Sequence, residues 1–192
     1  MRLRDPADAM SWHSFAEIYG PLIRGFCRGR GLQEADASDV AQEVLAQVAR
    51  SIRSFEYQPG RGRFRDWLGT ITRRKIARFV ATRDRGDRAA GGEQADGHLG
   101  AIESPEADTE WTSAFHDRIL QVALARVRPD FEPTTWVAFE RIWLDDRPSA
   151  ETAAELGLTI DAVYAAKSRV LKRLREEVVA LAEDLPWKGL RG

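Results

Sequence analysis

The residues with the most distinctive chemistry are basic side chains near the carboxyl end, and phosphate binding is the chemistry that they suit. They lie outside the apolar stripe of one predicted helix, on a face that shows Lys167, Ser168, Arg169, Lys172, Arg173 and Arg175. The opposite face is apolar, and we expect it to bury Ile160, Val163, Ala166 or Val170, and Leu174. A helix with one buried face and one basic face is suited to the major groove of DNA.

This basic helix is the second of two helices that we predict within residues 149–177, joined by a tight turn. Small residues such as Thr152 let the first helix approach a neighbour closely. Gly157 can end that helix at positive φ, where a side chain is penalised, and Thr159 or Asp161 can cap the second helix. The pattern predicts a helix-turn-helix. An ordinary pair of helices with a solvated basic face is the alternative.

The sequence does not support an enzyme. His13, His98 and His116 are scattered, and Cys27 is the single cysteine, so neither residue type forms a cluster. No glycine-rich nucleotide-binding motif precedes a helix, and the acidic residues lack the spacing of a metal-binding loop. We therefore expect no catalytic residue, no metal and no cofactor. For Cys27, we expect a small apolar position on a helix.

Composition limits the class of protein further. Of the 192 residues 31% are charged, yet the formal net charge is −1, so any contact with nucleic acid must come from local basic patches. No apolar run approaches the roughly 20 residues that a membrane span needs. The first ten residues lack the apolar core of a signal peptide. We expect the chain in the cytoplasm.

Apolar residues recur at helical spacing along most of the chain, and no useful strand pattern is present. We predict helices over residues 11–29, 34–55, from about 64 onwards, 109–128 and 134–144, before the helix-turn-helix. The stretch 85–109 is rich in glycine and poor in large apolar residues, which predicts a flexible linker. The expected fold is all-α, with two small helical domains, residues 1–84 and 110–182, and a tail at 183–192.

Three motifs in this order resemble the two-domain RNA polymerase sigma factors of the extracytoplasmic-function (ECF) type. The first is DVAQEV at residues 39–44, and the second is FRDWLGTITR at residues 64–73. The third is the helix-turn-helix, with the run RVLKRLR at residues 169–175. The resemblance covers about residues 11–84 and 110–179. It implies that residues 1–84 are sigma domain 2 and that residues 110–182 are sigma domain 4.

The resemblance implies that the helix over residues 34–55 binds core RNA polymerase. In the family this helix docks on a basic coiled coil of the largest subunit, and the flap is a further contact of the polymerase. The acidic and polar side chains that would form this surface are Asp36, Asp39, Gln42, Glu43 and Gln47. Complementary charge would speed and orient the docking. Without the resemblance, a merely solvated face would be the simpler reading.

The second expected site recognises and melts the −10 element of a promoter. Basic residues neutralise phosphates, and exposed aromatic rings stack on unpaired bases. The candidates are Tyr57, Arg61, Arg63, Phe64, Arg65, Trp67, Arg73, Arg74 and Arg78. Helical spacing favours a core position for Trp67. Arg74 stands where the family has Asn and Arg78 where it often has Asp, which leaves the identity of the −10 element open.

The third expected site reads the −35 element through the second helix of the helix-turn-helix. The residues expected to face base edges are Asp161, Tyr164, Ala165, Lys167, Ser168 and Arg169. Lys172 and Arg173 are expected to contact phosphates, which position the helix without reading sequence. Packing is an equal alternative for Tyr164.

Together these sites predict a sigma factor that directs core polymerase to promoter DNA and helps to open the −10 region. The alternative is a helix-turn-helix regulator with an amino-terminal sensor or dimerisation domain. An anti-sigma factor or a regulatory kinase would be a further partner, and Thr70, Thr72 and Thr82 are the candidate phosphorylation sites. The acidic linker would enter the polymerase channel or serve as a solvated tether.

Overall fold

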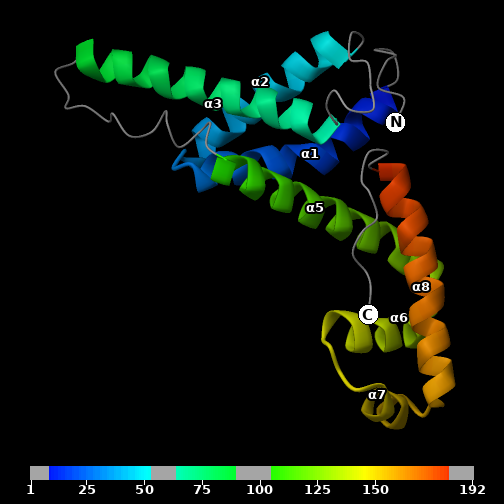
Figure 1. Cartoon of the computed structure of the whole chain (residues 1–192). Helices are drawn as coiled ribbons and strands as arrows, with labels where there is room; N and C mark the ends of the chain where they lie inside the picture. The colour runs from blue at the N-terminus through cyan, green and yellow to red at the C-terminus, as the bar shows by residue number, and fades with distance from the viewer. Residues whose placement is uncertain (1–8, 53–63, 90–104, 182–192) are drawn as a thin grey trace. The chain divides into compact units, whose positions relative to one another are not determined.

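Helices make up the whole of the regular structure that can be described (Figure 1). The computed structural model describes residues 9–52, 64–89 and 105–181. The α-helices are α1 (Ala9–Gly29), α2 (Glu34–Ser51), α3 (Phe64–Ala89), α5 (Pro105–Val127), α6 (Pro133–Phe139), α7 (Ser149–Leu156) and α8 (Ile160–Leu181). A short 3-10 helix, η2 (Arg128–Asp130), precedes α6, and a π-helical segment, η3 (Glu140–Leu144), follows it. No strand occurs in these three stretches, and the prediction of an all-α fold is confirmed.

The chain divides into two compact units, residues 1–118 and 119–192. The division lies inside α5 (Pro105–Val127), whereas the sequence suggested that the second domain starts at residue 110. The expected linker is also shortened at both ends, because α3 reaches Ala89 and α5 begins at Pro105. The rest of that linker and the expected tail at residues 183–192 lie outside the described residues.

In the first unit, α1 and α2 form an antiparallel hairpin, with α3 packed on α2 (Figure 1). The hairpin turn is closed by backbone hydrogen bonds from Arg30 N and Leu32 N to Cys27 O, at 3.0 and 3.2 Å. Gly31 adopts φ +84°, which a residue with a side chain rarely does. Although Pro21 lies within α1, the helix continues without a break.

The core of the first unit is a layer of aromatic and aliphatic side chains from all its helices. Phe15 and Tyr19 of α1 are buried with ring centroids 4.6 Å apart. Aliphatic residues of α2 and α3 complete the layer, namely Val40, Val44, Val48, Leu68 and Ile76. Cys27 is buried as expected, and burial raises the pKa of its thiol to about 12.

The first half of α5 belongs to this core. Trp111 is 1% exposed, its ring meets that of Phe26 edge-on at 5.1 Å, and its Nε1–H donates to the backbone oxygen of Arg65 at 2.9 Å. Phe115 is buried and stacks on Tyr19 with centroids 5.8 Å apart. Burial of these two large rings explains why residues 110–118 join the first unit instead of opening the second.

Gly69 of α3 makes the docking of Trp111 possible. A Cβ atom at this position would lie 2.6 Å from Nε1 and 2.7 Å from Cδ1 of Trp111, closer than side chains tolerate. The indole ring therefore fills the space that a side chain at position 69 would occupy.

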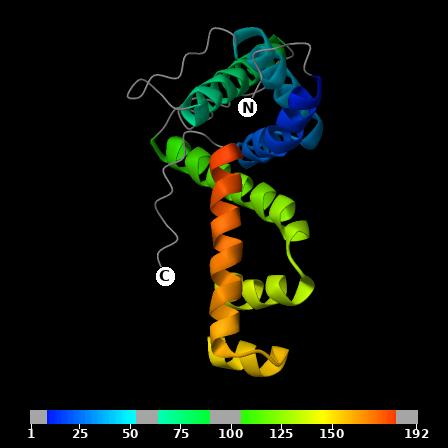
Figure 2. The ribbon, with the colours of Figure 1, turned by 90° about the vertical axis from the view of Figure 1, so that its right-hand side faces the viewer.

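In the second unit, α6 and α7 pack on α8 (Figure 2). Trp136 and Phe139 of α6 are buried with Val163, Val170 and Leu174 of α8. Both Ala166 and Val170 are buried, but the expectation for Ile160 was wrong, because its side chain is 46% exposed. Ile160 is the first residue of α8, at an end of the helix that its neighbours do not cover.

Substitution of Gly69 by alanine should destabilise the protein. The new methyl group would force the Trp111 ring out of position, and overpacking of this kind costs about 1–3 kcal/mol. Urea unfolding followed by circular dichroism would measure the loss.

Gly25→Ala is the matched control, since Gly25 lies inside α1 and a Cβ there would meet nothing within 4 Å. It should stabilise the helix by about 0.5–1 kcal/mol. Equal effects of the two substitutions would show that the space at Gly69 is not what holds Trp111.

Candidate nucleic-acid interface

The turn of the helix-turn-helix has the predicted geometry. Gly157 caps α7 in the left-handed region at φ +65°, and Leu158 N donates to Ala153 O at 2.9 Å. The backbone N–H of Ala162 donates to Oγ1 of Thr159 at 3.1 Å, so Thr159, and not Asp161, caps α8. These bonds fix the start of α8 against α7 and leave the side chain of Asp161 exposed.

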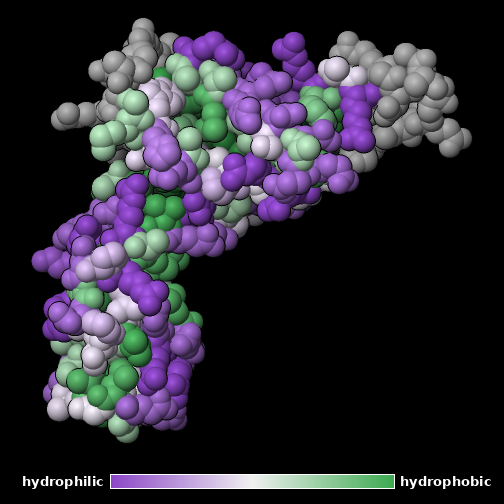
Figure 3. Space-filling model, turned by 180° about the vertical axis from the view of Figure 1, so that it is seen from behind, coloured by the Kyte–Doolittle hydropathy of each residue, from purple (hydrophilic) through white to green (hydrophobic). Residues whose placement is uncertain are grey.

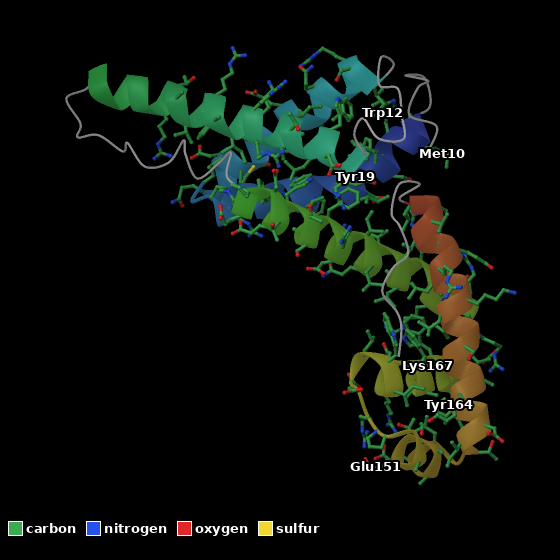
Figure 4. All side chains as sticks on the ribbon, in the orientation of Figure 1. Met10, Trp12, Tyr19, Glu151, Tyr164 and Lys167 are labelled. Atoms are coloured by element: carbon green, nitrogen blue, oxygen red, sulfur yellow. The ribbon has the colours of Figure 1, made fainter. Side chains whose placement is uncertain are left out.

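The outer face of α8 carries the residues predicted to read the −35 element. Tyr164, Ala165, Ser168 and Arg169 are exposed with Asp161, and Lys167 is half-buried. Figure 4 shows Tyr164 and Lys167 on this helix, with Glu151 on α7. The opposite stripe of α8 is buried, so the core sets the direction in which this face points. Side chains from about two and a half turns of the helix are thereby presented together.

Tyr164 is both exposed and in contact with a neighbouring helix, so neither of the two roles considered for it, base contact and packing, excludes the other. Its side chain is 52% exposed, and its hydroxyl oxygen accepts a hydrogen bond from Oγ of Ser149 at 3.1 Å. Ser149 is the first residue of α7. The bond therefore ties the exposed face of α8 to the preceding helix.

The two predicted phosphate contacts have different surroundings. Lys172 is exposed, and no ion pair to it is seen among the described residues. Arg173 is paired with Asp130 at 2.9 Å and with Glu177 at 3.2 Å. The hydrogen bond to Glu177, with both negative charges, raises the pKa of Arg173. Arg173 thus stabilises the second unit internally, and Lys172 is the more available of the two.

Sequence reasoning missed an ion-pair network in front of α7. Glu155 accepts hydrogen bonds from Arg147 and from Arg141, which closes the turn between α6 and α7. The hydrogen bond from Arg147 is the main cause that lowers the pKa of Glu155. The spacing of Arg147, Glu151 and Glu155 at every fourth residue was a signal for part of this network. Nothing local pointed to Arg141.

The residues predicted to bind polymerase lie along the surface of α2. Asp39, Gln42 and Glu43 are exposed, opposite the buried stripe of this helix, and Asp36 and Gln47 are half-buried. Seen from behind, the first unit shows mainly hydrophilic residues (Figure 3). The polar face that the sequence indicated is therefore present on α2.

Basic side chains of α3 pair with two of these acids. Lys75 Nζ lies 2.9 Å from Glu43 Oε2, and Arg83 Nη1 lies 3.2 Å from Asp36 Oδ2. The hydrogen bond from Lys75 is the main cause that lowers the pKa of Glu43. Part of the acidic surface is thus balanced by α3 within the chain itself.

The residues predicted for the −10 element fall into separate groups. Arg74 and Arg78 are exposed one turn apart on α3. Arg65 and Arg73 have side chains only 11% and 14% exposed, and α5 supplies partners for both. Arg65 Nη1 lies 3.0 Å from His116 Nε2, and Arg73 Nη1 lies 2.8 Å from Asp108 Oδ1. Tyr57, Arg61 and Arg63 lie outside the described residues.

The two aromatic candidates of this group pack inside the first unit. Phe64 is half-buried, with its ring 5.6 Å from that of Tyr19 and 5.7 Å from that of Trp67. Trp67 is also half-buried, in keeping with the core position that its spacing favoured. Both rings therefore contribute to the packing of this unit, and their contacts with bases stay a prediction.

Burial also limits the candidate phosphorylation sites. Thr72 is fully buried, and its hydroxyl donates to Leu68 O at 2.9 Å, so a kinase cannot reach it in the folded unit. Thr70 is half-buried and Thr82 is exposed. The expectation for Thr72 was wrong because the helix turns it inward at this point.

Other classes of site find no support in the described stretches of the chain. Within them, no group of three or more His, Cys, Asp or Glu side chains could hold a metal ion. None of the described helices is both long and apolar enough to cross a membrane.

Comparison with known proteins supports the motif-based resemblance. Residues 15–86, which include most of α1, all of α2 and all but the last three residues of α3, match the family model described as Sigma-70 region 2. The chain is also similar to the ECF RNA polymerase sigma factor RpoE of Cereibacter sphaeroides. The two are 26% identical over 176 residues, which covers 92% of this chain and 91% of the relative.

The network at Glu155 predicts a pH-dependent contribution to the stability of the second unit. Because the folded-state pKa of Glu155 is lowered, its contribution is complete above the ordinary glutamate pKa of about 4.3 and is lost as the pH falls further. Urea unfolding should therefore show Glu155→Gln less stable than the unchanged chain at neutral pH, with a smaller difference in acid.

Glu151→Gln is the control, since Glu151 lies 4.0 Å from Arg147 and makes a weaker pair. A stability difference for Glu155→Gln that stays constant from neutral to acid pH would contradict the role given to its charge.

Proposed function

We propose that separate helices of this chain make the separate contacts of a sigma factor. The premise is that the chain belongs to the ECF sigma factors, which direct RNA polymerase to promoters. The chain is not an enzyme, since polymerase carries out the chemistry of transcription. Our proposal assigns the polymerase contact to α2, the −10 contact to α3 and the −35 contact to α8. Such a factor acts with polymerase in the cytoplasm.

The exposed face of α8 is the observation that carries the −35 assignment. Lys167 and Arg169 can donate to guanine O6 and N7, while Ala165 can touch a thymine methyl group. Lys172 lies further along the helix, where a phosphate contact positions the protein on the duplex. The bond between Tyr164 and Ser149 supports a fixed presentation of this face.

We assign the docking of core polymerase to Asp39, Gln42 and Glu43 on α2, with Asp36 and Gln47 at the edges of this face. The partner is a basic coiled coil of the largest subunit, and the second unit would contact the flap. Opposite charges steer such an encounter and fix its orientation. An anti-sigma factor that covers α2 or α8, or a kinase acting on Thr70 or Thr82, would regulate these contacts.

We assign the −10 strand contact to the exposed basic pair Arg74 and Arg78. Arg73 would join them once DNA displaces its partner Asp108. In the sigma factors that this chain resembles, the loop before the helix equivalent to α3 receives a base flipped out of the −10 strand, and we assign that role to residues 57–63. Holding a flipped base stabilises melted DNA without ATP hydrolysis. A helix-turn-helix regulator that binds DNA without polymerase is the rival function. No feature of the described residues favours it.

Run-off transcription on pooled genomic promoter fragments, with bacterial core polymerase, tests the proposed function. The chain should create new start sites that are absent with core polymerase alone. Tight specific DNA binding by the chain alone, without new start sites, would favour the regulator.

Two substitutions in α8 should separate reading from positioning. Arg169→Ala should relax the choice of −35 sequence and cost about 1–3 kcal/mol of discrimination at one base pair. Lys172→Ala should weaken binding to all promoters alike. It should also reduce the slope of log affinity against log salt concentration by about one. Holoenzyme binding to a randomised −35 library, at two salt concentrations, measures both. Identical sequence preferences in all three proteins would remove Arg169 from the reading face.

Charge reversal on α2 should impair assembly with polymerase. Glu43→Lys should weaken core binding about tenfold, because a like charge would face the basic coiled coil. Lys75→Ala is the matched control. It breaks the same intramolecular ion pair but leaves Glu43 in place, and it should bind core normally. If both substitutions weaken assembly equally, the α2–α3 pair, not the acidic face, is what polymerase binding requires.

A further inference from the structure

A small cavity lies where α3 meets the beginning of α5. Thr70, Arg73, Arg74 and Asp108 line it, and its volume is about 210 Å³. A water molecule takes up about 30 Å³ in the liquid, so the cavity has room for an oxyanion of phosphate size. Its walls carry two guanidinium groups, the side chains best matched to phosphate.

Arg73 is held in this cavity with donor capacity to spare. Its side chain is 14% exposed, and Asp108 Oδ1 lies 2.8 Å from its Nη1. The two groups attract as ions, yet Nη1 is buried and makes no well-directed hydrogen bond to any described residue. A guanidinium has five N–H donors, and this ion pair leaves them poorly used.

Asp108 is kept beside Arg73 by the packing of α5. It precedes Trp111 by one helical turn, and Trp111 is anchored by its burial, by the space at Gly69 and by its bond to Arg65. The Asp108 side chain itself is 66% exposed. It can therefore turn away from Arg73 without any movement of the helix.

Thr70 and Arg74 complete the surroundings of Arg73. The Thr70 hydroxyl donates to Asp66 O at 2.8 Å, so this residue shapes the cavity without offering a donor to an anion. Arg74 is exposed at the rim, and no carboxylate is seen paired with it in the described part of the chain. An incoming anion would meet Arg74 first and could then compete with Asp108 for Arg73.

From these observations we propose that Arg73 and Arg74, in a cavity walled by Thr70, bind a DNA backbone phosphate, and that Asp108 occupies Arg73 as an internal counterion until DNA replaces it. The inference rests on the proposed function, in which α3 faces the promoter. It specifies a phosphate contact within the α3 site already proposed, and it adds a restraint by α5 on DNA affinity. The restraint is electrostatic, because α5 stays docked through Trp111.

The test measures binding of the full chain to a short fluorescein-labelled single-stranded DNA of mixed sequence by fluorescence anisotropy. Asp108→Asn should bind this probe about two- to fivefold more tightly, the range expected for release of one partly exposed ion pair. Asp117→Asn is the matched control. It makes the same charge change in α5 at an exposed position with no ion pair in the described stretches. Equal tightening by both substitutions would overturn the proposal.

Arg73→Gln supplies the second arm. It should weaken DNA binding, and in its background Asp108→Asn should no longer tighten binding, because the two residues act through each other. Persistent tightening without Arg73 would overturn the proposal. Thermal unfolding of each variant distinguishes a role in stability from a role in DNA binding. A lower melting temperature for Asp108→Asn with unchanged DNA affinity would also refute the proposal.

The run-off assay distinguishes failure of the phosphate-site proposal from failure of the proposed function. Promoter-specific transcription by the unchanged chain, with no difference between Asp108→Asn and Asp117→Asn in DNA affinity, would refute the phosphate site alone. Absence of promoter-specific starts would refute the premise and this inference together.

Discussion

The first unit depends on the burial of Trp111 against α3. This one ring fills the space left by Gly69, meets Phe26 of α1 and satisfies its own N–H on the backbone of Arg65. A buried indole that keeps its hydrogen bond combines a large apolar contribution with no polar penalty. It makes the first half of α5 a fourth helix of the unit. Other α5 contacts follow from it, including the ion pair of Glu110 with Arg30 at 2.6 Å.

The docking of α5 reduces the number of basic residues on α3 that are available to contact DNA. Lys75 and Arg83 face acids of α2, and Arg65 and Arg73 face α5. Among the described arginines predicted to contact the −10 element, only Arg74 and Arg78 are exposed. The chain as a whole has a net charge of −1. Among the described residues of α3, the proposed contact with DNA therefore rests on these two exposed charges and on the exchange of an internal partner for a phosphate.

Local chemistry made much of the structure predictable. The helices, the left-handed Gly157, the Thr159 cap and the buried stripe of α8 follow from residues within a few positions of one another. The docking of Trp111 on Gly69 joins residues 42 positions apart in the sequence, and no periodicity reveals such a contact. The same holds for Arg141, whose partner Glu155 comes from another helix. The predicted site residues within 53–63 lie outside the described residues.

The hairpin between α1 and α2 contains a natural reporter of its own opening. Cys27 is the only cysteine in the chain, it is fully buried, and the pKa of its thiol is about 12. Alkylating reagents attack the thiolate, so in the closed unit this sulfur lacks both access and reactive charge. Its rate of modification therefore follows how often α1 separates from its neighbours. The rate of Cys27 alkylation in the native chain can thus report the opening of this unit, with no engineered label.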